Sequence, residues 1–309
     1  MNRDPTAQPA HALVTAASCP QAIARALTWP GLLLSCCAIL AYGFAQGRAT
    51  LYFNLSYAWI VVWLLWLEYR LPYRADWRRP DGQIFQDLAH SALNKGVVQL
   101  LIVSLAARGL LDHRSNGFLS DAPLSVQVIC GLIGAEFGLY WAHRLKHEWP
   151  ALWRFHAVHH SVRKLWLVNT GRFHFIDSLL AVVASLPFFL LSGMSMDAII
   201  WVSAITAYIG ILTHCNVAVN CGWLSYIFNT PTLHRWHHAR DSKIGNSNYG
   251  ENLVLWDMLL GTYCNRRGEE VGTIGIDEHM PRGFVQQLAV PFAWRRHQAV
   301  HRSVPGETG

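Results

Sequence analysis

Long apolar runs alternate with short polar segments along this chain. The runs long enough to cross a bilayer, or nearly so, are Trp29–Gln46, Leu51–Leu67, Gly96–Leu111 and Leu124–Ala142. A helix that spans the hydrocarbon core needs about 20 predominantly apolar residues, so the third run is of marginal length. This pattern predicts an all-α, multi-pass transmembrane bundle.

A further apolar stretch covers Ile176–Thr213 and is interrupted at residues 191–197, LSGMSMD. Gly193 and its polar neighbours favour a turn at this point. The stretch would then form two helices of about 16 residues, which is short for two full spans. A helical hairpin and a re-entrant pair both fit the pattern.

The pattern divides the chain into four regions: a polar N-terminal segment (1–28), N-terminal transmembrane helices (29–123), a histidine-rich region (124–265) and a cytoplasmic C-terminal tail (266–309). The first region has no short apolar core followed by a cleavage site, so a cleaved signal peptide is not expected. The polar end of the chain, from about Gln298, is expected to be disordered.

Composition supports a membrane protein. Only 14% of the residues are charged, against about 25% in soluble domains. Many of the 14 tryptophans stand at the ends of apolar runs, as in a membrane-interface belt. The net charge of +6 comes from basic residues scattered through short loops, so no nucleic-acid partner is expected. The seven cysteines form no C-x-x-C pair and are predicted to be free, buried thiols.

Basic residues gather in two of the polar segments. The first holds Arg70, Arg74, Arg78, Arg79 and Lys95, and the second holds Arg144, Lys146, Arg154, Arg163, Lys164 and Arg172. Two spans separate these segments, so both are expected on one side of the membrane, which the positive-inside rule makes cytoplasmic. A hairpin would return the chain to that side. The short chain and compact loops favour a bacterial inner membrane.

Histidines are concentrated in the second half of the chain. Ten of the 16 lie between positions 143 and 238. They form one H-x3-H motif (His143, His147), two H-x2-H-H motifs (His156, His159, His160 and His234, His237, His238), and the single residues His174 and His214. Histidines at i, i+3 and i+4 share one face of a helix. The other six, expected to be solvated or structural, are His11, His90, His113, His279, His297 and His301.

Three such helix faces supply eight ring nitrogens, which suits two metal ions with open positions. Imidazole binds iron, zinc and copper, and no thiolate is placed to favour structural zinc. Chelation by histidine alone at a membrane surface fits a redox-active metal that must bind dioxygen. A chance gathering of surface histidines is disfavoured because the longer motif occurs twice.

At these motifs the sequence resembles the sterol desaturase and fatty acid hydroxylase superfamily of membrane di-iron enzymes. The matching stretches, in the order of that family, are YWAHRLKH, WRFHAVHHS, GRFHFID, THCNV and HRWHHARDSKIGNSNYGENLVLWDMLLGTY. The details HHS and SNYG…WD…GT are most similar to the bacterial sterol-desaturase-like branch, which is related to alkylglycerol monooxygenase. The resemblance covers about residues 124–265. It implies that these residues form a fatty acid hydroxylase-like di-iron catalytic domain. With the apolar runs, the whole chain is expected to form about four spans and a short helical hairpin, with a cytoplasmic histidine-rich helical cap.

Carried over position by position, the resemblance implies two irons bound by His143, His147, His156, His159, His160, His214, His234, His237 and His238. His174 matches the histidine of the family's R-x-H-P-x-E motif. Here Phe175 and Asp177 replace the proline and the glutamate. His174 could therefore be a ligand, a group that supports a ligand or a substrate contact.

Three other polar residues could support the ligands. Glu136 lies two helical turns before His143 and could accept a ring N–H, or it could pair with Arg144. Asp257 could also accept a ring N–H. Asn216 could bond to a ligand or serve as a turn residue. The arginines near the ligands could pair with carboxylates or with lipid phosphates; they are Arg144, Arg172 and Arg235.

The resemblance implies hydroxylation of a C–H bond in a lipid, such as a sterol, fatty acyl chain or ether lipid, with dioxygen as co-substrate. An apolar cavity between the spans would admit the lipid from the bilayer. The electrons are expected from a separate donor protein of the ferredoxin or cytochrome type. The alternatives are a desaturase or carotenoid hydroxylase with the same metal site, a histidine-rich membrane metal transporter, and a structural metal-binding protein without turnover.

Overall fold

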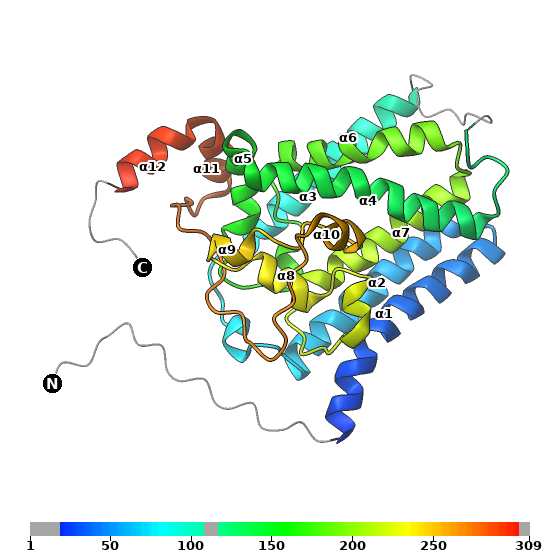
Figure 1. The fold of residues 1–309 in the computed structure, drawn as a ribbon, viewed down its shortest axis with the longest axis horizontal. Coiled ribbons are helices and arrows are strands. Elements are labelled where there is room, and N and C mark those ends of the chain that lie inside the picture. Colours follow the sequence, from blue (N-terminus) through cyan, green and yellow to red (C-terminus); the bar gives the residue numbers. More distant parts are fainter. Residues whose placement is uncertain (1–18, 108–116, 303–309) are drawn as a thin grey trace.

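The computed structural model describes residues 19–107 and 117–302, and within these ranges it contains helices and no β-strand (Figure 1). The α-helices are α1 (Cys19–Ala45), α2 (Ala49–Arg70), α3 (Ile84–Ala107), α4 (Leu124–Glu148), α5 (Pro150–His160), α6 (Phe175–Ser192), α7 (Met196–Thr213), α8 (Pro231–His237), α9 (Ser242–Gly245), α10 (Leu255–Leu260), α11 (Phe284–Ala289) and α12 (Trp294–Arg302). Four short 3-10 helices connect them: η1 (Ala75–Arg78), η2 (Leu167–Asn169), η3 (Gly222–Tyr226) and η4 (Val290–Ala293).

Five of the described helices are long and apolar enough to cross a membrane, namely α1, α2, α4, α6 and α7. Large apolar side chains such as Leu34, Val62 and Leu191 are exposed on them, as contact with lipid requires. The expected all-α, multi-pass transmembrane fold is confirmed. The six described cysteine side chains are free thiols, as predicted.

The predicted ends of the spans differ from those observed. α1 begins at Cys19 instead of Trp29, so part of the expected polar N-terminal segment is helical, while residues 1–18 lie outside the described ranges. α4 continues six residues past Ala142. His143 and His147 therefore belong to the last two turns of a membrane-spanning helix, and do not follow it. Polar side chains such as histidine can stand at the end of a span, where it meets the membrane interface, and the helix continues through them.

The third predicted span, Gly96–Leu111, corresponds to part of α3, and residues 108–116 lie outside the described ranges. As described, α3 is not among the five helices apolar enough to span. It begins earlier than predicted, and its first half buries Asp87, His90 and Asn94. The Asn94 amide donates to the carbonyls of Gly171 and Phe173. α3 therefore supports the segment between α5 and α6.

The predicted turn between the last two apolar helices is present. Gly193 ends α6 in the left-handed conformation with φ 69°, which glycine adopts without steric cost. Ser195 then caps α7 by accepting from the Ala198 N–H. Each of the two helices has 18 residues and qualifies as a full span by length and composition.

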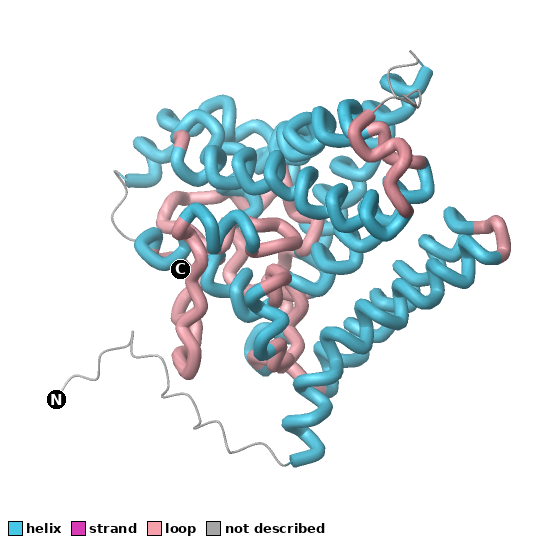
Figure 2. The backbone as a smooth tube through the Cα atoms, turned by 45° about the vertical axis from the view of Figure 1, so that its right-hand side comes forward, coloured by secondary structure: helices cyan, strands magenta, loops and turns pink. Residues whose placement is uncertain are grey.

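Helix α2 is joined near its C-terminal end to the loops around the histidine motifs. The buried carboxylate of Glu68 accepts from the backbone N–H of Leu167, at 2.8 Å, and of Asn216, at 2.9 Å. These two bonds satisfy backbone donors that burial would otherwise leave unpaired. They hold the loops after α5 and α7 together, and Figure 2 shows much of the loop backbone enclosed between helices.

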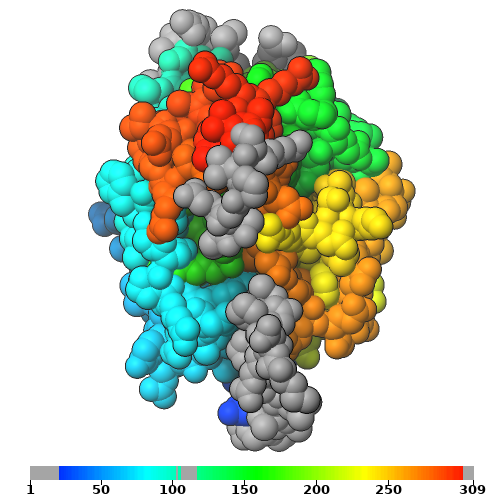
Figure 3. All heavy atoms as spheres, turned by 90° about the vertical axis from the view of Figure 1, so that its left-hand side faces the viewer, coloured from blue at the N-terminus to red at the C-terminus, as the bar shows by residue number. Residues whose placement is uncertain are grey.

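The C-terminal residues pack onto the protein. Val271 and Ile274 join Trp77, Leu165 and Trp236 in a buried cluster. The predicted disorder from Gln298 is wrong as far as Arg302, because α12 is helical there and Gln298 is buried; residues 303–309 lie outside the described ranges. The orange and red C-terminal segments lie across the upper part of one face (Figure 3).

Candidate metal centre

Nine histidines converge where α4, α5, α8 and the end of α7 meet. They form a five-histidine group, His143, His147, His156, His160 and His237, and a four-histidine group, His159, His214, His234 and His238. In each group one nitrogen per ring lies within 4.8 Å of the others. The structure thus brings together all nine histidines that the resemblance implied as ligands, from segments far apart in the sequence.

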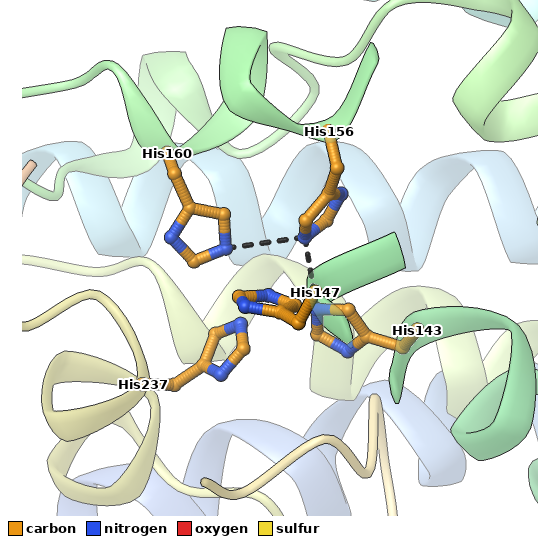
Figure 4. A group of neighbouring side chains, drawn as sticks. All are labelled: His143, His147, His156, His160 and His237. Atoms are coloured by element: carbon orange, nitrogen blue, oxygen red, sulfur yellow. Dashed lines mark hydrogen bonds between the residues drawn. The ribbon is translucent and has the colours of Figure 1, made fainter. Parts of the chain in front are cut away.

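Two consecutive helices build most of the five-histidine group. Pro150 stands at the first position of α5, where its missing N–H costs no hydrogen bond, and its fixed φ lets α5 begin directly after α4. The H-x3-H pair of α4 then faces the ring nitrogens of α5. The Nε2 atom of His156 lies 3.0 Å from that of His143 and 3.1 Å from that of His160 (Figure 4).

The four-histidine group joins α5 to α8 and to the end of α7. The Nε2 atom of His238 lies 3.1 Å from the Nε2 atoms of both His159 and His234. The ring centroids of His214 and His234 are 4.7 Å apart. Because His159 and His160 are neighbours on α5, one turn of helix supplies ligand positions to both groups.

These separations fit metal coordination. Metal–imidazole bonds are about 2.1 Å long, so two ligands at right angles place their nitrogens about 3.0 Å apart. Where three Nε2 atoms meet, as around His156 and around His238, protons alone cannot satisfy every lone pair. The Nε2 atoms of His147 and His237 are also buried without a hydrogen-bond partner. Each group therefore fits one metal ion.

Acceptors on the outside of the site hold many of the rings in one tautomer. The Nδ1–H of His143 donates to the Tyr249 carbonyl at 2.7 Å, and the Nδ1–H of His237 donates to the Ser247 carbonyl, also at 2.7 Å. The Arg172 carbonyl accepts from His159 at 3.2 Å. Such bonds fix the ring orientation and leave Nε2 as the metal-binding atom.

Burial keeps the rings outside the spans in their neutral form. It lowers the pKa of His159, His160, His234 and His238 well below the ordinary value, and nearby histidines lower it further. The pKa of His214 and of His237 falls to about 3, again mainly through burial. Neutral imidazole is the form that binds metal, so these side chains are ready to act as ligands at neutral pH.

Asp177 has a role that the sequence did not reveal. Its carboxylate accepts from Nδ1 of His156 at 2.8 Å and forms a buried ion pair with Lys146. The motif comparison left this carboxylate without a role because it replaces a glutamate. Its position in the first turn of an apolar helix could have indicated this role, because a carboxylate there needs a hydrogen-bonding or charged partner.

The other predicted supporting residues contact backbone and not the ligand rings. Glu136 accepts from the backbone N–H groups of Glu251 and Asn252 instead of from a histidine or Arg144. Asp257 accepts from the backbone N–H of Tyr249, and the Tyr249 carbonyl accepts from the His143 ring. Asp257 therefore supports His143 indirectly, through the backbone of Tyr249.

Asn216 and His174 are also placed by backbone contacts. The Asn216 side-chain amide accepts from the Arg74 backbone N–H and donates to the Arg74 carbonyl. These contacts agree with the interpretation of Asn216 as a loop residue. His174 lies outside both histidine groups. It caps α6 by accepting from the Ile176 N–H, and its Nε2 donates to the Leu288 carbonyl at 3.2 Å.

The three arginines differ in their surroundings. Arg144 pairs with Glu148 at 2.8 Å on the surface, and Arg172 pairs with the buried Asp87 at 2.8 Å. Arg235 is buried, donates to two backbone carbonyls and lies over the Tyr73 ring. Of the two predicted kinds of partner, Arg144 and Arg172 have a carboxylate. Burial of Arg172 and Arg235 disfavours lipid phosphate as a partner of either.

Two cavities border the site region. A polar cavity of about 2440 Å³ reaches His147, His160 and His237 and is lined by charged side chains of both signs, including Asp81 and Arg154. An apolar groove of about 650 Å³ lies between α4 and α6, with Phe137 and Leu180 in its wall. One opening thus suits water and polar groups, and the other suits hydrocarbon chains.

Comparison with known proteins now identifies the family. The fatty acid hydroxylase family matches residues 128–262. The ornithine lipid hydroxylase OlsE of Rhizobium tropici is 42% identical over 296 residues, which cover 93% of this chain and 89% of that protein. The chain belongs to the fatty acid hydroxylase family. It is an integral membrane oxidoreductase of the lipid hydroxylase type.

More distant relatives of this fatty acid hydroxylase share only part of their length with it. The alkylglycerol monooxygenase of Xenopus tropicalis is 33% identical over 132 residues, 42% of this chain and 29% of that protein. The fatty acid hydroxylase vlmA of Lecanicillium sp. is 30% identical over 146 residues, 42% of this chain and 40% of that protein. No solved structure matches the chain significantly. The segment matched by the family contains the histidine motifs.

Proposed function

We propose that this enzyme hydroxylates an ornithine lipid, with two iron ions bound by the nine histidines and dioxygen as co-substrate. The observation that carries the substrate class is the 42% identity to an ornithine lipid hydroxylase along nearly the full length of both chains. Two irons are supported by the presence of two histidine groups, each of which offers four or five ring nitrogens close enough to share one ion.

When bound, the iron ions supply the activation of dioxygen that oxidation of an unactivated C–H bond requires. The chain holds them with neutral imidazoles and fixes the rings from behind. Asp177 orients His156, and the Tyr249 carbonyl orients His143. Eight of the nine rings are buried and His147 is half-buried, which restricts water around the reacting atoms. The protein therefore contributes binding, orientation and exclusion of solvent.

The two cavities suit the two parts of the proposed substrate. An ornithine lipid combines a charged amino-acid headgroup with hydrocarbon chains. The polar cavity has carboxylates and cations near His147, His160 and His237, which can pair with the charges of such a headgroup. The apolar groove between α4 and α6 faces the region where acyl chains would lie. Cavities of this size accommodate small-molecule ligands and chain segments.

We place the metal centre on the cytoplasmic side of a bacterial inner membrane. The support is the excess of arginine and lysine in the segments that carry the histidines. The same face would receive a separate electron donor of the ferredoxin or cytochrome type, since the polar cavity gives the five-histidine group its opening to the aqueous phase. Metal transport is disfavoured because the chain belongs to an enzyme family.

The proposal is tested by lipid analysis of a strain that lacks the gene and is complemented with wild-type or variant protein. Wild-type protein should produce an ornithine lipid that is one oxygen atom heavier. His159→Ala and His237→Ala, one from each group, should abolish this product at wild-type protein levels in the membrane. His11→Ala, at a position that belongs to none of the histidine motifs, serves as a control. An unchanged ornithine lipid with a changed lipid of another class would contradict the substrate, and product in both ligand variants would contradict the metal centre.

A further inference from the structure

A third group of histidines lies apart from the nine-histidine centre. His297 and His301 stand one turn apart on α12, and His279 lies in the loop before α11. One ring nitrogen of each lies within 4.8 Å of the others. Nδ1 of His279 and Nε2 of His297 are 3.0 Å apart. His297 and His301 have H-x3-H spacing, but nothing in the sequence pattern joins them to His279, because 17 residues separate His279 from His297.

The three rings are packed against one another. His279 and His301 are stacked with centroids 3.7 Å apart, and the centroids of His297 and His301 are 4.7 Å apart. Three protonated imidazoles at these distances would repel one another. In the neutral form each ring instead offers a lone pair to a shared cation.

A buried glutamine fixes the loop against the helix. The Gln298 side chain accepts from the backbone N–H of His279 at 3.0 Å and donates to the His279 carbonyl at 2.9 Å. Gln298 lies between the two histidines of α12 in sequence, and only 7% of it is exposed. Its two bonds define the position of the His279 backbone relative to α12, so the three rings are brought together by the fold itself.

We propose that His279, His297 and His301 bind one Zn²⁺ ion, or a divalent transition-metal ion of the same class, at a site separate from the nine-histidine centre. Three imidazoles with one open position form a known zinc arrangement, the fourth ligand being water. Nitrogen-only ligands disfavour Mg²⁺ and Ca²⁺, which prefer oxygen.

The ion at this site would join two segments that border the polar cavity. His279 and His301 both line that cavity, and the same cavity reaches His147, His160 and His237. The loop of residues 274–282 and α12 would be connected by metal–nitrogen bonds in addition to the Gln298 contacts. The role of the site is thus to fasten one wall of the cavity, outside the catalytic centre.

The first test measures zinc binding to the iron-loaded holoenzyme, purified with a tag that contains no histidine. Equilibrium dialysis against Zn²⁺ alone should give one more bound zinc per chain for wild type than for a His297→Gln, His301→Gln double variant. An Arg295→Gln, Arg296→Gln double variant alters exposed neighbours on the same helix and should bind zinc as wild type does. Gln298→Ala should bind it about 10- to 100-fold more weakly, as expected when a ligand loses its support.

Equal zinc binding by wild type and the histidine double variant would overturn the proposal, as would zinc uptake that only replaces iron. A second measurement follows hydrogen exchange with and without Zn²⁺. Exchange in residues 274–282 and α12 should slow in wild type and also in His159→Ala, but not in the histidine double variant. Because His159 belongs to the catalytic centre, this comparison separates failure of the zinc site from failure of the proposed hydroxylase function. No slowing in wild type would refute the fastening role.

Discussion

At the scale of single residues, the carboxylate of Asp177 links the metal centre to the membrane helices. It stands in the first turn of α6, accepts from His156 on α5 and pairs with Lys146 on α4. The three side chains are buried. An unpaired charge at such a position would be strongly unfavourable, so each partner depends on the other two.

We predict that Asp177→Asn weakens iron binding by about 10- to 100-fold, because the amide orients His156 less firmly and leaves Lys146 without its counter-charge. Iron content per chain, titrated by a chelator in membranes, measures the effect. Asp197→Asn, an exposed acid in the first turn of α7, is the matched control and should retain iron. The role assigned to Asp177 fails if both variants hold iron equally well.

The sequence predicted which histidines come together better than it predicted the groups that orient them. The nine histidine positions follow from helical spacing and family motifs, which are local features. Their partners include the carbonyls of Tyr249 and Ser247. Every residue has such a carbonyl, so only the tertiary fold selects which one meets a ring. Glu136 was misjudged for the same reason, since its partners belong to a loop more than a hundred residues away.

At the scale of elements, α4 and α6 touch closely at a glycine. A Cβ atom on Gly138 would lie 2.0 Å from the Ala184 carbonyl oxygen, so no larger side chain fits without movement of the backbone. This contact lies beside the apolar groove, which both residues help to line. Small residues at such crossings allow the backbones of membrane helices to approach.

We predict that Gly138→Ala destabilises the protein by about 1–3 kcal/mol through overpacking. Thermal unfolding in detergent measures the change. Gly210→Ala is the control, because Gly210 is also helical and a Cβ atom added there would meet nothing within 4 Å; that substitution should be neutral or stabilise by up to about 1 kcal/mol. Equal melting temperatures for the two variants would contradict the close contact.

A second contact between elements depends on pH. His90 of α3 is buried and bonds through Nε2 to the Gln287 amide oxygen of α11 at 3.1 Å. Burial, with a further contribution from the charge of Arg172, lowers the pKa of His90 to about 4. The folded protein therefore keeps this ring neutral at pH values where the unfolded chain would protonate it.

The His90 contribution to stability is fully present above the unfolded pKa of about 6.5 and is lost as pH falls towards 4. The slope in that window is about 1.4 kcal/mol per pH unit. We predict that the protection of α11 amides, corrected for the intrinsic exchange rate at each pH, falls between pH 7 and pH 5 in wild type and falls less in His90→Gln. The same loss of protection in both proteins would assign the effect to other groups.

The elements show why the sequence predicted the other spans better than it predicted the start of α3. Apolar length identified α2, α4 and the α6–α7 hairpin. α3 was placed too late because Asp87 and Asn94 read as loop residues, whereas both are buried against Arg172 and the Gly171–Phe173 segment. Periodicity cannot distinguish a polar residue that faces water from one that faces a protein partner.

At the scale of the whole molecule, the protein has one end that carries the histidine groups and an opposite end. The opposite end contains the turn between α1 and α2, at Gln46–Arg48, and the α6–α7 turn, where the Leu119 N–H donates to the Ser192 carbonyl. The helices α5, α8 and α12, which carry residues of the described histidine groups, lie towards the other end (Figure 1). This polarity is the basis for the proposed orientation.

We predict that a cysteine introduced at Asp241, which is exposed near the metal centre, reacts with a membrane-impermeant thiol reagent only when the cytoplasmic side is open. A cysteine at Gln46 should react in intact spheroplasts. Each of the two introduced cysteines is the control for the other. The described native cysteines are buried or half-buried, so they should react less than the introduced ones. The reverse labelling pattern would invert the orientation.

The spread of the ligands along the chain has a consequence for biosynthesis. His143 to His160 leave the ribosome well before His234 to His238, and each group requires residues from both segments. Neither histidine group is complete until α8 has folded against α5, after all the described spanning helices have been made. Under the proposed function, metal acquisition is then a late maturation step, and we expect a chain truncated before α8 to enter the membrane yet leave both histidine groups incomplete.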